Sequence, residues 1–412
     1  MATRYTDPGF TTNLLSLFVP GSGALPPVLA GRDGDLRVLQ GFLQRLLNNR
    51  PVPADAVIYG PRGNGKTVLL ETFRRQCAEQ DTDTLDLTPA AIGNVTDLAS
   101  HLLYDDSVIG KFLASITPSG VSIDLQAIGA RWDSMTPAGK DDVKRRHLVQ
   151  MLLARCRKRP LVVALDEAHT LDIEVGHTLL NASQQVRKQG APFLLAIAGT
   201  PNLRDHLNQM SATFWNRAEK IGIGRLDREA TIEALAAPLA GAGIAFDKDA
   251  LDSVVQESQR YPYFIQLWGE ALCHAMVDTM RFHAQAGIVD AARPRFEAGK
   301  TAYYGDRYRE LRKQGLLQAA GAVAGIFGGQ ETAGYIDLSD HLVAQTGVAA
   351  QTADTQLDQL ADLGYIWQPA GDDLCEPGIP SLMAHVQAEL ATGKSVATLA
   401  SQQTDQNSVC PE

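Results

Sequence analysis

This chain of 412 residues contains few cysteines, few aromatic residues and no long apolar run. Its five cysteines, at positions 77, 156, 273, 375 and 410, are scattered, odd in number and without C-x-x-C spacing, which argues against a disulfide framework and a zinc site. No apolar run approaches the ~20 residues of a membrane-spanning helix. Leu14–Val19 is too short and too weakly flanked for a signal peptide. We therefore expect a cytoplasmic protein with reduced thiols and no membrane contact.

Positive charge is also scarce. The chain has 37 Lys and Arg against 47 Asp and Glu, a formal net charge of -10 and a pI near 5.4. This balance argues against a surface that coats nucleic acid generally, although a local basic patch is compatible with it. A hydrophobic fraction of 45% is that of an ordinary globular protein, and the length predicts two or three domains.

The stretch GPRGNGKT, Gly60–Thr67, fits the phosphate-binding pattern G-x-x-x-x-G-K-[ST]. Ala56–Tyr59 before it predicts a short buried strand, and Val68–Phe73 after it predicts the start of a helix. In this context the glycines let backbone N–H groups close on phosphate oxygens at a helix N-terminus. Lys66 would reach the β- and γ-phosphates, and Thr67 would ligate Mg²⁺. The plain alternative is a glycine turn with a solvated lysine.

Further strands are predicted at Thr84–Leu87, Leu161–Leu165 and Phe193–Ala198. The last two are uninterrupted apolar runs, as expected of strands inside a parallel sheet. Helical patterns separate the strands and polar residues follow their ends, so a ligand site is expected at the carboxyl edge of the sheet. The predicted fold class is α/β, a P-loop NTPase parallel sheet with helices on both faces.

Asp166 and Glu167 directly follow the second of these strands. Phosphoryl transfer at a P-loop needs a carboxylate in the Mg²⁺ shell and a residue that orients the attacking water. Asp166 suits the first role, and Glu167 suits the second as general base. Thr200, at the end of the adjacent strand, is a candidate for sensing the γ-phosphate or positioning the water. His169 is expected to be a packing or hydrogen-bonding neighbour.

Together with Gly31–Asp33, these motifs resemble an AAA+ ATPase of the origin-recognition-type and STAND-like group over about residues 25–390. The resemblance implies ATP and Mg²⁺ as cofactors, and a helical lid. Segment 213–218 resembles the one that supplies an arginine finger, so Arg217 is a candidate for acting on a neighbour's ATP. Arg260 lies where such lids carry a nucleotide-sensing arginine, although Arg260-Tyr261-Pro262 matches neither that pattern nor the G-x-P turn of STAND-like members.

The candidate site residues fall into three groups. Those expected to bind the nucleotide are Gly60, Pro61, Arg62, Gly63, Asn64, Gly65, Lys66, Thr67, Val68, Arg32 and Arg260. Those expected to act in catalysis are Glu167, Lys66, Thr200 and Arg217, and those expected to hold the metal are Thr67 and Asp166.

Five segments are predicted along the chain. They are an extended N-terminal arm (1–27), a P-loop AAA+ core (28–225) with an insertion at about 104–136, an all-α lid (226–290), a winged-helix-like domain (291–390) and a disordered tail (391–412). In the lid, Asp227 and Asp247 are each expected to cap a helix.

The winged-helix-like domain is expected to contain helices at 316–327, 338–345 with Asp337 as cap, and 352–363, followed by a hairpin from Gly364 that turns at 371–373. In DNA-binding versions the third helix enters the major groove. Here that helix carries Asp354, Asp358 and Asp362, and no Lys or Arg lies between Lys313 and Lys394. Because phosphate contacts supply much of the affinity for DNA, this domain is expected to bind a protein, another subunit or its own core.

The leading hypothesis is an ATP-dependent molecular switch that binds ATP and ADP and couples nucleotide state to protein–protein interaction or self-association. The first alternative is a DNA-binding initiator or loader, which could use the insertion or the basic stretch at 140–159, although a solvated helix face also accounts for that stretch. The second alternative is a nucleotide-binding scaffold with negligible turnover. The biological process, the partner and the oligomeric state are left open by the sequence.

Overall fold

The computed structural model describes residues 8–21, 23–102, 148–369, 373–379 and 381–392. The chain divides into two compact units. The sheet unit comprises residues 32–59 and 66–221, and the helical unit comprises residues 1–31, 60–65 and 222–412. The division falls inside the phosphate loop, between Gly65 and Lys66. The expected insertion at 104–136, its alternating stretch at 121–125 and the tail from 393 lie outside the described residues.

The sheet unit is built on five strands in the order β2-β3-β4-β1-β5. Parallel pairs join β2 to β3, β3 to β4 and β4 to β1, and every residue of β1, β3 and β4 is buried. These findings confirm the predicted strands and the P-loop NTPase sheet. The edge strand β5 was not predicted, because only Ile221 of its four residues is buried and apolar. The strands are β1 (Ala56–Tyr59), β2 (Asp83–Leu87), β3 (Leu161–Leu165), β4 (Phe193–Gly199) and β5 (Glu219–Gly222).

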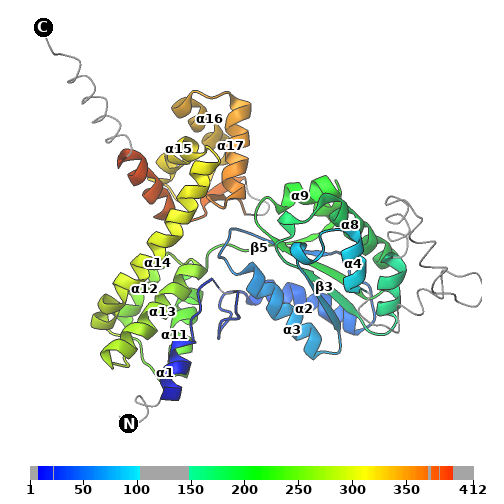
Figure 1. Ribbon diagram of the computed structural model, residues 1–412, viewed down its shortest axis with the longest axis horizontal. Coiled ribbons are helices and arrows are strands. Elements are labelled where there is room, and N and C mark those ends of the chain that lie inside the picture. The colour runs from blue at the N-terminus through cyan, green and yellow to red at the C-terminus, as the bar shows by residue number, and fades with distance from the viewer. Residues whose placement is uncertain (1–7, 22, 103–147, 370–372, 380, 393–412) are drawn as a thin grey trace, which may run out of the picture. The chain divides into compact units, whose positions relative to one another are not determined.

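Helices cover both faces of this sheet, as predicted (Figure 1). On one face α2 packs against α3, which contacts β1 to β4, and α8 lies on the other face against β4 with α4 and α9 beside it. Their apolar spacing faces the sheet: Leu39, Leu43 and Leu46 of α2 are buried. The helices are α2 (Asp33–Leu47), α3 (Lys66–Glu79), α4 (Val95–Leu102), α8 (Ile173–Lys188), α9 (Leu203–Met210) and the short α10 (Phe214–Arg217), with a further helical segment at 148–156.

In the helical unit, the expected lid contains α11 (Arg228–Gly241), α12 (Lys248–Glu257) and α13 (Pro262–Thr279). Asp227 caps α11 as predicted, since its carboxylate accepts a hydrogen bond of 2.7 Å from the Ala230 N–H. Asp247 occupies the N-cap position of α12 but makes no capping hydrogen bond. Its carboxylate instead lies 2.6 Å from His283 Nε2, so a tertiary partner replaces the predicted cap.

The expected extended arm is wrong in its middle part, because Pro8–Leu15 forms the helix α1. Phe10 and Leu14 are four residues apart and therefore lie on one face of this helix, and Phe18 follows shortly after its end. Leu14 and Phe18 are buried, and the Phe18 ring fills the space beside Gly269 of α13. The proline and glycine content of the segment concealed this periodicity, and burial against α13 supplies the free energy that a short isolated helix lacks.

The predicted boundary between lid and C-terminal domain, at 290/291, falls inside the continuous helix α14 (Ala286–Lys313). Ile288 and Phe296 of α14 share one hydrophobic core with α13 and with the C-terminal elements, and both segments belong to the helical unit. No described helix, α14 included, has the length and apolar character needed to span a membrane.

The C-terminal elements are α15 (Leu317–Phe327), α16 (Tyr335–Thr346) and α17 (Ala350–Asp362), followed by the antiparallel hairpin β7 (Ile366–Trp367) and β8 (Leu374–Pro377). A short strand, β6 (Ala333–Gly334), pairs with β8. The expected three helices and hairpin are therefore present. Asp337 does not cap α16, because that helix begins earlier, after Gly334. Residues 381–392 are helical, so the chain keeps regular structure two residues beyond the expected start of the tail.

The four described cysteines are buried free thiols. Burial raises the pKa of Cys77, Cys156 and Cys273 to about 12 and that of Cys375 to about 11. Because the thiolate is the reactive form, these four should resist iodoacetamide at neutral pH in the native protein and react fully in denaturant, as read by mass spectrometry of peptides. Native labelling of any one at the unfolded rate would contradict its burial.

Candidate functional site

At the carboxyl edge of the sheet, α3 begins at Lys66, and β3 ends just before Asp166. The Lys66 side chain is nearly buried. Thr67 Oγ1 donates a hydrogen bond of 2.6 Å to Asp166 Oδ2, although 99 residues separate the two in sequence. The structure therefore brings together the two residues that the sequence assigned to the metal.

The Thr67–Asp166 pair fits a magnesium site that the substrate completes. Among the described residues, no group of three or more His, Cys, Asp or Glu could hold a metal ion. Mg²⁺ is ordinarily held by one or two protein oxygen ligands together with water and substrate phosphates. A hydroxyl and a carboxylate in direct contact match that donor set.

Glu167 stands apart from its neighbour in both geometry and exposure. Its backbone is left-handed (φ 51°, ψ 30°), and its side chain is 51% exposed, so water can reach the carboxylate. Asp166 Oδ1 accepts a hydrogen bond of 2.8 Å from the Glu167 N–H, which fixes the turn. A left-handed backbone in a residue other than glycine is sparsely populated and is often found at functional sites.

A polar chain runs from Glu167 to the end of β4. Glu167 Oε2 lies 3.4 Å from Nε2 of His169, and Nδ1 of the same ring lies 3.5 Å from the Thr200 N–H. Thr200, itself buried, donates its hydroxyl to Asn202 Oδ1 over 2.5 Å. His169 is thus the hydrogen-bonding neighbour that the sequence predicted. Asn202 was missed; its only signal was its position after the Gly199-Thr200-Pro201 strand end.

The first six residues of the phosphate loop belong to the helical unit, where two glycines are required. Gly60 (φ +155°) and Gly63 (φ +81°) have backbones that favour glycine, and a Cβ at either position would clash. At Gly60 it would lie 2.1 Å from the Ile223 carbonyl oxygen, and at Gly63 2.1 Å from the Tyr261 hydroxyl. Because glycine has no side chain, Gly60 and Gly63 leave room for the loop to follow its path.

Tyr261 is a contact that sequence reasoning missed. The tyrosine is fully buried, and its hydroxyl donates a hydrogen bond to the Arg62 carbonyl and contacts the Tyr303 hydroxyl at 3.1 Å. Burial raises the pKa of Tyr261 well above its usual value, with Tyr303 adding to the shift, so the hydroxyl stays protonated and can donate. The sequence had directed attention to the preceding residue, Arg260.

The C-terminal hairpin also meets the loop within the helical unit. A Cβ at Gly364 would lie 3.6 Å from Pro61 Cβ and 3.7 Å from the Arg62 nitrogen, so Gly364 packs on the loop backbone. Further along, Arg225 lies 3.8 Å from the Glu376 carboxylate of β8. The phosphate loop is therefore in contact with the element that the sequence predicted to be a protein-binding output.

Arg260 lies in the helical unit, and Arg32 lies in the sheet unit. Arg260 is left-handed (φ 58°), its carbonyl accepts from the Leu226 N–H, and its side chain lines a pocket of the helical unit with Arg225 and Arg228. Arg32 is nearly buried in the sheet unit, with Nη1 3.9 Å from the Asp35 carboxylate one turn into α2. The roles of both in nucleotide binding stay predictions.

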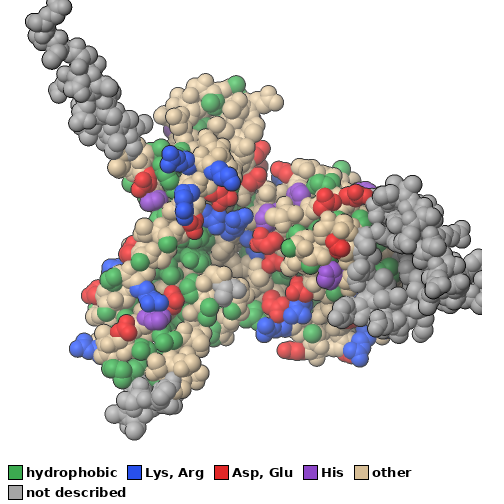
Figure 2. All heavy atoms as spheres, viewed as in Figure 1, with side chains coloured by type: hydrophobic (Ala, Val, Ile, Leu, Met, Phe, Trp, Pro, Cys, Tyr) green, Lys and Arg blue, Asp and Glu red, His purple; other side chains and the backbone are tan. Residues whose placement is uncertain are grey.

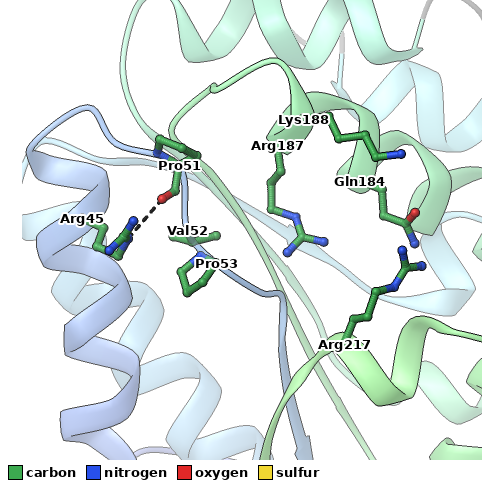
Figure 3. A pocket seen from close by; sticks show the side chains of 8 residues that line it. All are labelled: Arg45, Pro51, Val52, Pro53, Gln184, Arg187, Lys188 and Arg217. Carbon is green, nitrogen blue, oxygen red and sulfur yellow. Dashed lines mark hydrogen bonds between the residues drawn. The ribbon is translucent and has the colours of Figure 1, made fainter.

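Arg217 lies at the opposite edge of the sheet from Lys66, Asp166 and Glu167. It ends α10, where Nη2 donates 2.6 Å to Thr213 Oγ1, and it faces a pocket lined by residues that precede β1 and β4 (Figure 3). Lys66 and Asp166, in contrast, follow the ends of β1 and β3. A four-residue strand spans about 13 Å, so at least that length of sheet separates the two edges.

Residues 28–197 match the model of a family described as the AAA ATPase domain. No curated protein has a sequence similar enough to count as a relative. Among solved structures, a Walker-type ATPase of Pyrococcus abyssi is 16% identical with a TM-score of 0.56, over 91% of this chain and 99% of that one. The ORC2 protein of Aeropyrum pernix, solved as ADPNP–ADP complexes, is 14% identical with a TM-score of 0.53, over 94% and 99%.

Proposed function

We propose that this chain is an AAA+ P-loop ATPase, with the match to the AAA ATPase domain at residues 28–197, and that it binds ATP with Mg²⁺ and hydrolyses it as a molecular switch. The observation that carries the proposal is the hydrogen bond between Thr67 and Asp166, which joins the two magnesium-binding positions of the motifs. The ADPNP–ADP complexes of the Aeropyrum pernix protein, which shares the fold, support a nucleotide as the ligand.

Each residue has a distinct task in this proposal. Loop N–H groups and Lys66 would bind the phosphates, and Thr67 and Asp166 would hold Mg²⁺. The metal would supply positive charge to the phosphate oxygens. Glu167 accepts a proton from the attacking water, which its exposure admits. His169 and Thr200 fix the position of that carboxylate relative to the end of β4.

We assign Arg217 to a neighbouring subunit's ATP. Within its own sheet unit the guanidinium lies at the edge where the parallel strands begin, whereas phosphate-binding Lys66 lies where they end. An arginine that acts on the nucleotide of its own subunit would need to lie at the edge where the strands end. A cation at the edge where the strands begin can act on ATP only if one copy of the chain presents it to the ATP of another copy.

Specific ATPase activity should therefore rise with protein concentration, and Arg217→Ala should lower it by about tenfold or more at the highest concentration. The measurement is steady-state turnover across a concentration series, with size-exclusion chromatography in ATP and in ADP. Arg157→Ala, which removes an exposed cation from another part of the sheet unit, is the matched control. Concentration-independent turnover that Arg217→Ala leaves unchanged would remove the finger assignment.

We further propose that nucleotide state is passed from the loop to the C-terminal hairpin and helices as a protein-binding output. Three neighbouring residues support this. Tyr261 binds the loop at Arg62, while Gln259, two residues earlier, accepts a hydrogen bond of 3.2 Å from the Ser381 N–H in the last helical segment. Gln259 and Arg260 are both left-handed, so the segment between the two contacts is held in a sparsely populated conformation.

Removing the Tyr261 hydroxyl tests this coupling. A hydrogen bond of this kind contributes ~0.5–1.5 kcal/mol net, so Tyr261→Phe should reduce the difference in hydrogen exchange between ATP and ADP states at residues 366–377 by roughly twofold to tenfold. Tyr308→Phe, on α14, is the matched control. An undiminished difference in Tyr261→Phe would show that the loop signals by another route.

The acidic C-terminal helix supports a protein partner over DNA. Figure 2 shows no Lys or Arg over α16 and α17 on the face it draws. Asp354 and Asp358 accept hydrogen bonds from Ser339 and Tyr335 of α16, so the structure holds these carboxylates in place. A DNA backbone would meet fixed negative charge there. At the basic stretch, Arg155 pairs with Asp83 at 2.6 Å, which favours a structural role for part of that charge.

A further inference from the structure

A pocket of about 370 Å³ opens in the sheet unit at the edge where the strands begin. Two prolines, a valine and a glutamine line it together with four cations, and no acidic residue takes part. Figure 3 shows the Arg187 and Arg217 guanidinium groups approaching it from α8 and α10, with Gln184 beside Arg217. The lining residues are Arg45, Pro51, Val52, Pro53, Gln184, Arg187, Lys188 and Arg217.

The cations outnumber the negative charge that surrounds them. Beneath the pocket, Asp55 is 1% exposed and pairs with Arg187 at 2.9 Å. Its oxygens also accept from the Ser183 hydroxyl and the Leu195 N–H, so they are already occupied. The C-termini of α2 and α8 add roughly half a negative charge each. Four cations therefore exceed Asp55 and the two helix ends by about two elementary charges.

The cations of the basic stretch, at the far end of the same edge of the sheet, differ from those of the pocket in their pairing. There Arg155 pairs with Asp83 at 2.6 Å, and Arg159 pairs with Asp81 at 3.3 Å. Those cations have carboxylate partners on the surface. In the pocket, the buried Asp55 is the only carboxylate among the described residues that pairs with a lining cation. The chain as a whole has a net charge of -10. The positive charge is thus concentrated where the surface is hollowed.

The donors of the pocket are only partly used. Arg187 Nε is buried and has no hydrogen-bond partner among the described residues. Arg45 commits Nε to the Pro51 carbonyl, and Arg217 commits Nε and Nη2 to Thr213. A guanidinium carries five N–H groups in a planar fork that matches phosphate oxygens. A buried donor without a partner is unfavourable, and an anionic acceptor in the pocket would satisfy it.

We propose that this pocket is an anion site, separate from the phosphate loop, that binds a small phosphate-bearing ligand of two or more negative charges. Two excess charges match a dianion, and the volume lies at the lower end of the ~300–1,000 Å³ usual for ligand pockets. Arg187 donates to its oxygens, Lys188 and Arg45 hold its charge near the rim, and Arg217 adds positive charge from α10. The inference goes beyond the proposed hydrolysis and does not depend on it.

The test is a calorimetric titration of the full chain with inorganic pyrophosphate, performed in the Lys66→Ala background at a concentration where sedimentation shows monomer. Saturable binding that weakens with added salt is expected. Adding Arg45→Ala and Lys188→Ala should weaken it by about tenfold or more, because each removes a charged donor. Both side chains are exposed, so the fold should persist, as a thermal melt will check. Arg157→Ala is the matched control.

The results separate the sources of the phosphate. Pyrophosphate bound by the phosphate loop would be insensitive to Arg45→Ala and Lys188→Ala, and that outcome, or no saturable binding, overturns the site. Protection of Lys188 from acetylation that appears only with ATP, only in the associated protein with Lys66 intact, would assign the phosphate to a second copy's nucleotide and overturn a free anion. A DNA duplex that displaces pyrophosphate at lower concentration than inorganic phosphate does would overturn the small-ligand assignment.

Discussion

Replacing Lys66 with alanine should weaken ATP binding by at least about a hundredfold and reduce hydrolysis to background, since hydrogen bonds to charged groups contribute ~1.5–3 kcal/mol each. Lys66 is the first residue of α3, directly after the glycine loop, and its side chain is nearly buried rather than solvated. The ammonium group is therefore held near the place where the loop N–H groups and the helix N-terminus attract phosphate. The measurement is equilibrium binding of a fluorescent ATP analogue, followed by steady-state turnover.

Arg75→Ala provides the control for Lys66→Ala. Arg75 lies on the same helix, is 58% exposed and pairs with Glu71, so its removal changes the charge of α3 without touching the loop. ATP affinity should be unchanged in this variant. Equal affinities in Lys66→Ala and the unmutated chain would end the assignment of the loop as a nucleotide site.

Replacing Glu167 with glutamine should leave ATP binding within about twofold and lower turnover by about 10²–10⁴, the usual contribution of a general base. Glutamine keeps the shape of the side chain, and the Asp166 contacts to Thr67 and to the backbone at position 167 do not use the Glu167 carboxylate. Binding and chemistry should therefore separate. Single-turnover hydrolysis with the protein in excess measures the chemical step directly.

The matched control is Glu174→Gln, an exposed acid in the first turn of α8. It removes the same charge from the same unit and should retain full turnover. If Glu167→Gln hydrolysed ATP at the unmutated rate, Glu167 would not be the general base, and turnover itself would contradict the hypothesis of a scaffold without hydrolysis. If both variants bound ATP but neither they nor the unmutated chain hydrolysed it, the scaffold reading would be favoured.

Sequence reasoning succeeded where local pattern and burial agree. The runs at 161–165 and 193–198 are apolar at every position, which only a strand buried on both faces requires, and both are strands. It failed where a distant partner decides the outcome. The α1 helix depends on packing against α13, and the cap expected from Asp247 is lost to His283. Neither partner can be read from neighbouring residues.

By itself the sequence determined four of the five strands, the phosphate loop and the adjacent carboxylates of Asp166 and Glu167, because each follows from residues adjacent in the chain. Only the tertiary structure decided that Thr67 touches Asp166, that the Tyr261 hydroxyl binds the loop at Arg62, and that Arg217 joins three other cations at the opposite edge. The physical reason is that strand and loop formation depend on local periodicity and backbone freedom, whereas contacts between residues 99 or 199 positions apart depend on how whole elements pack.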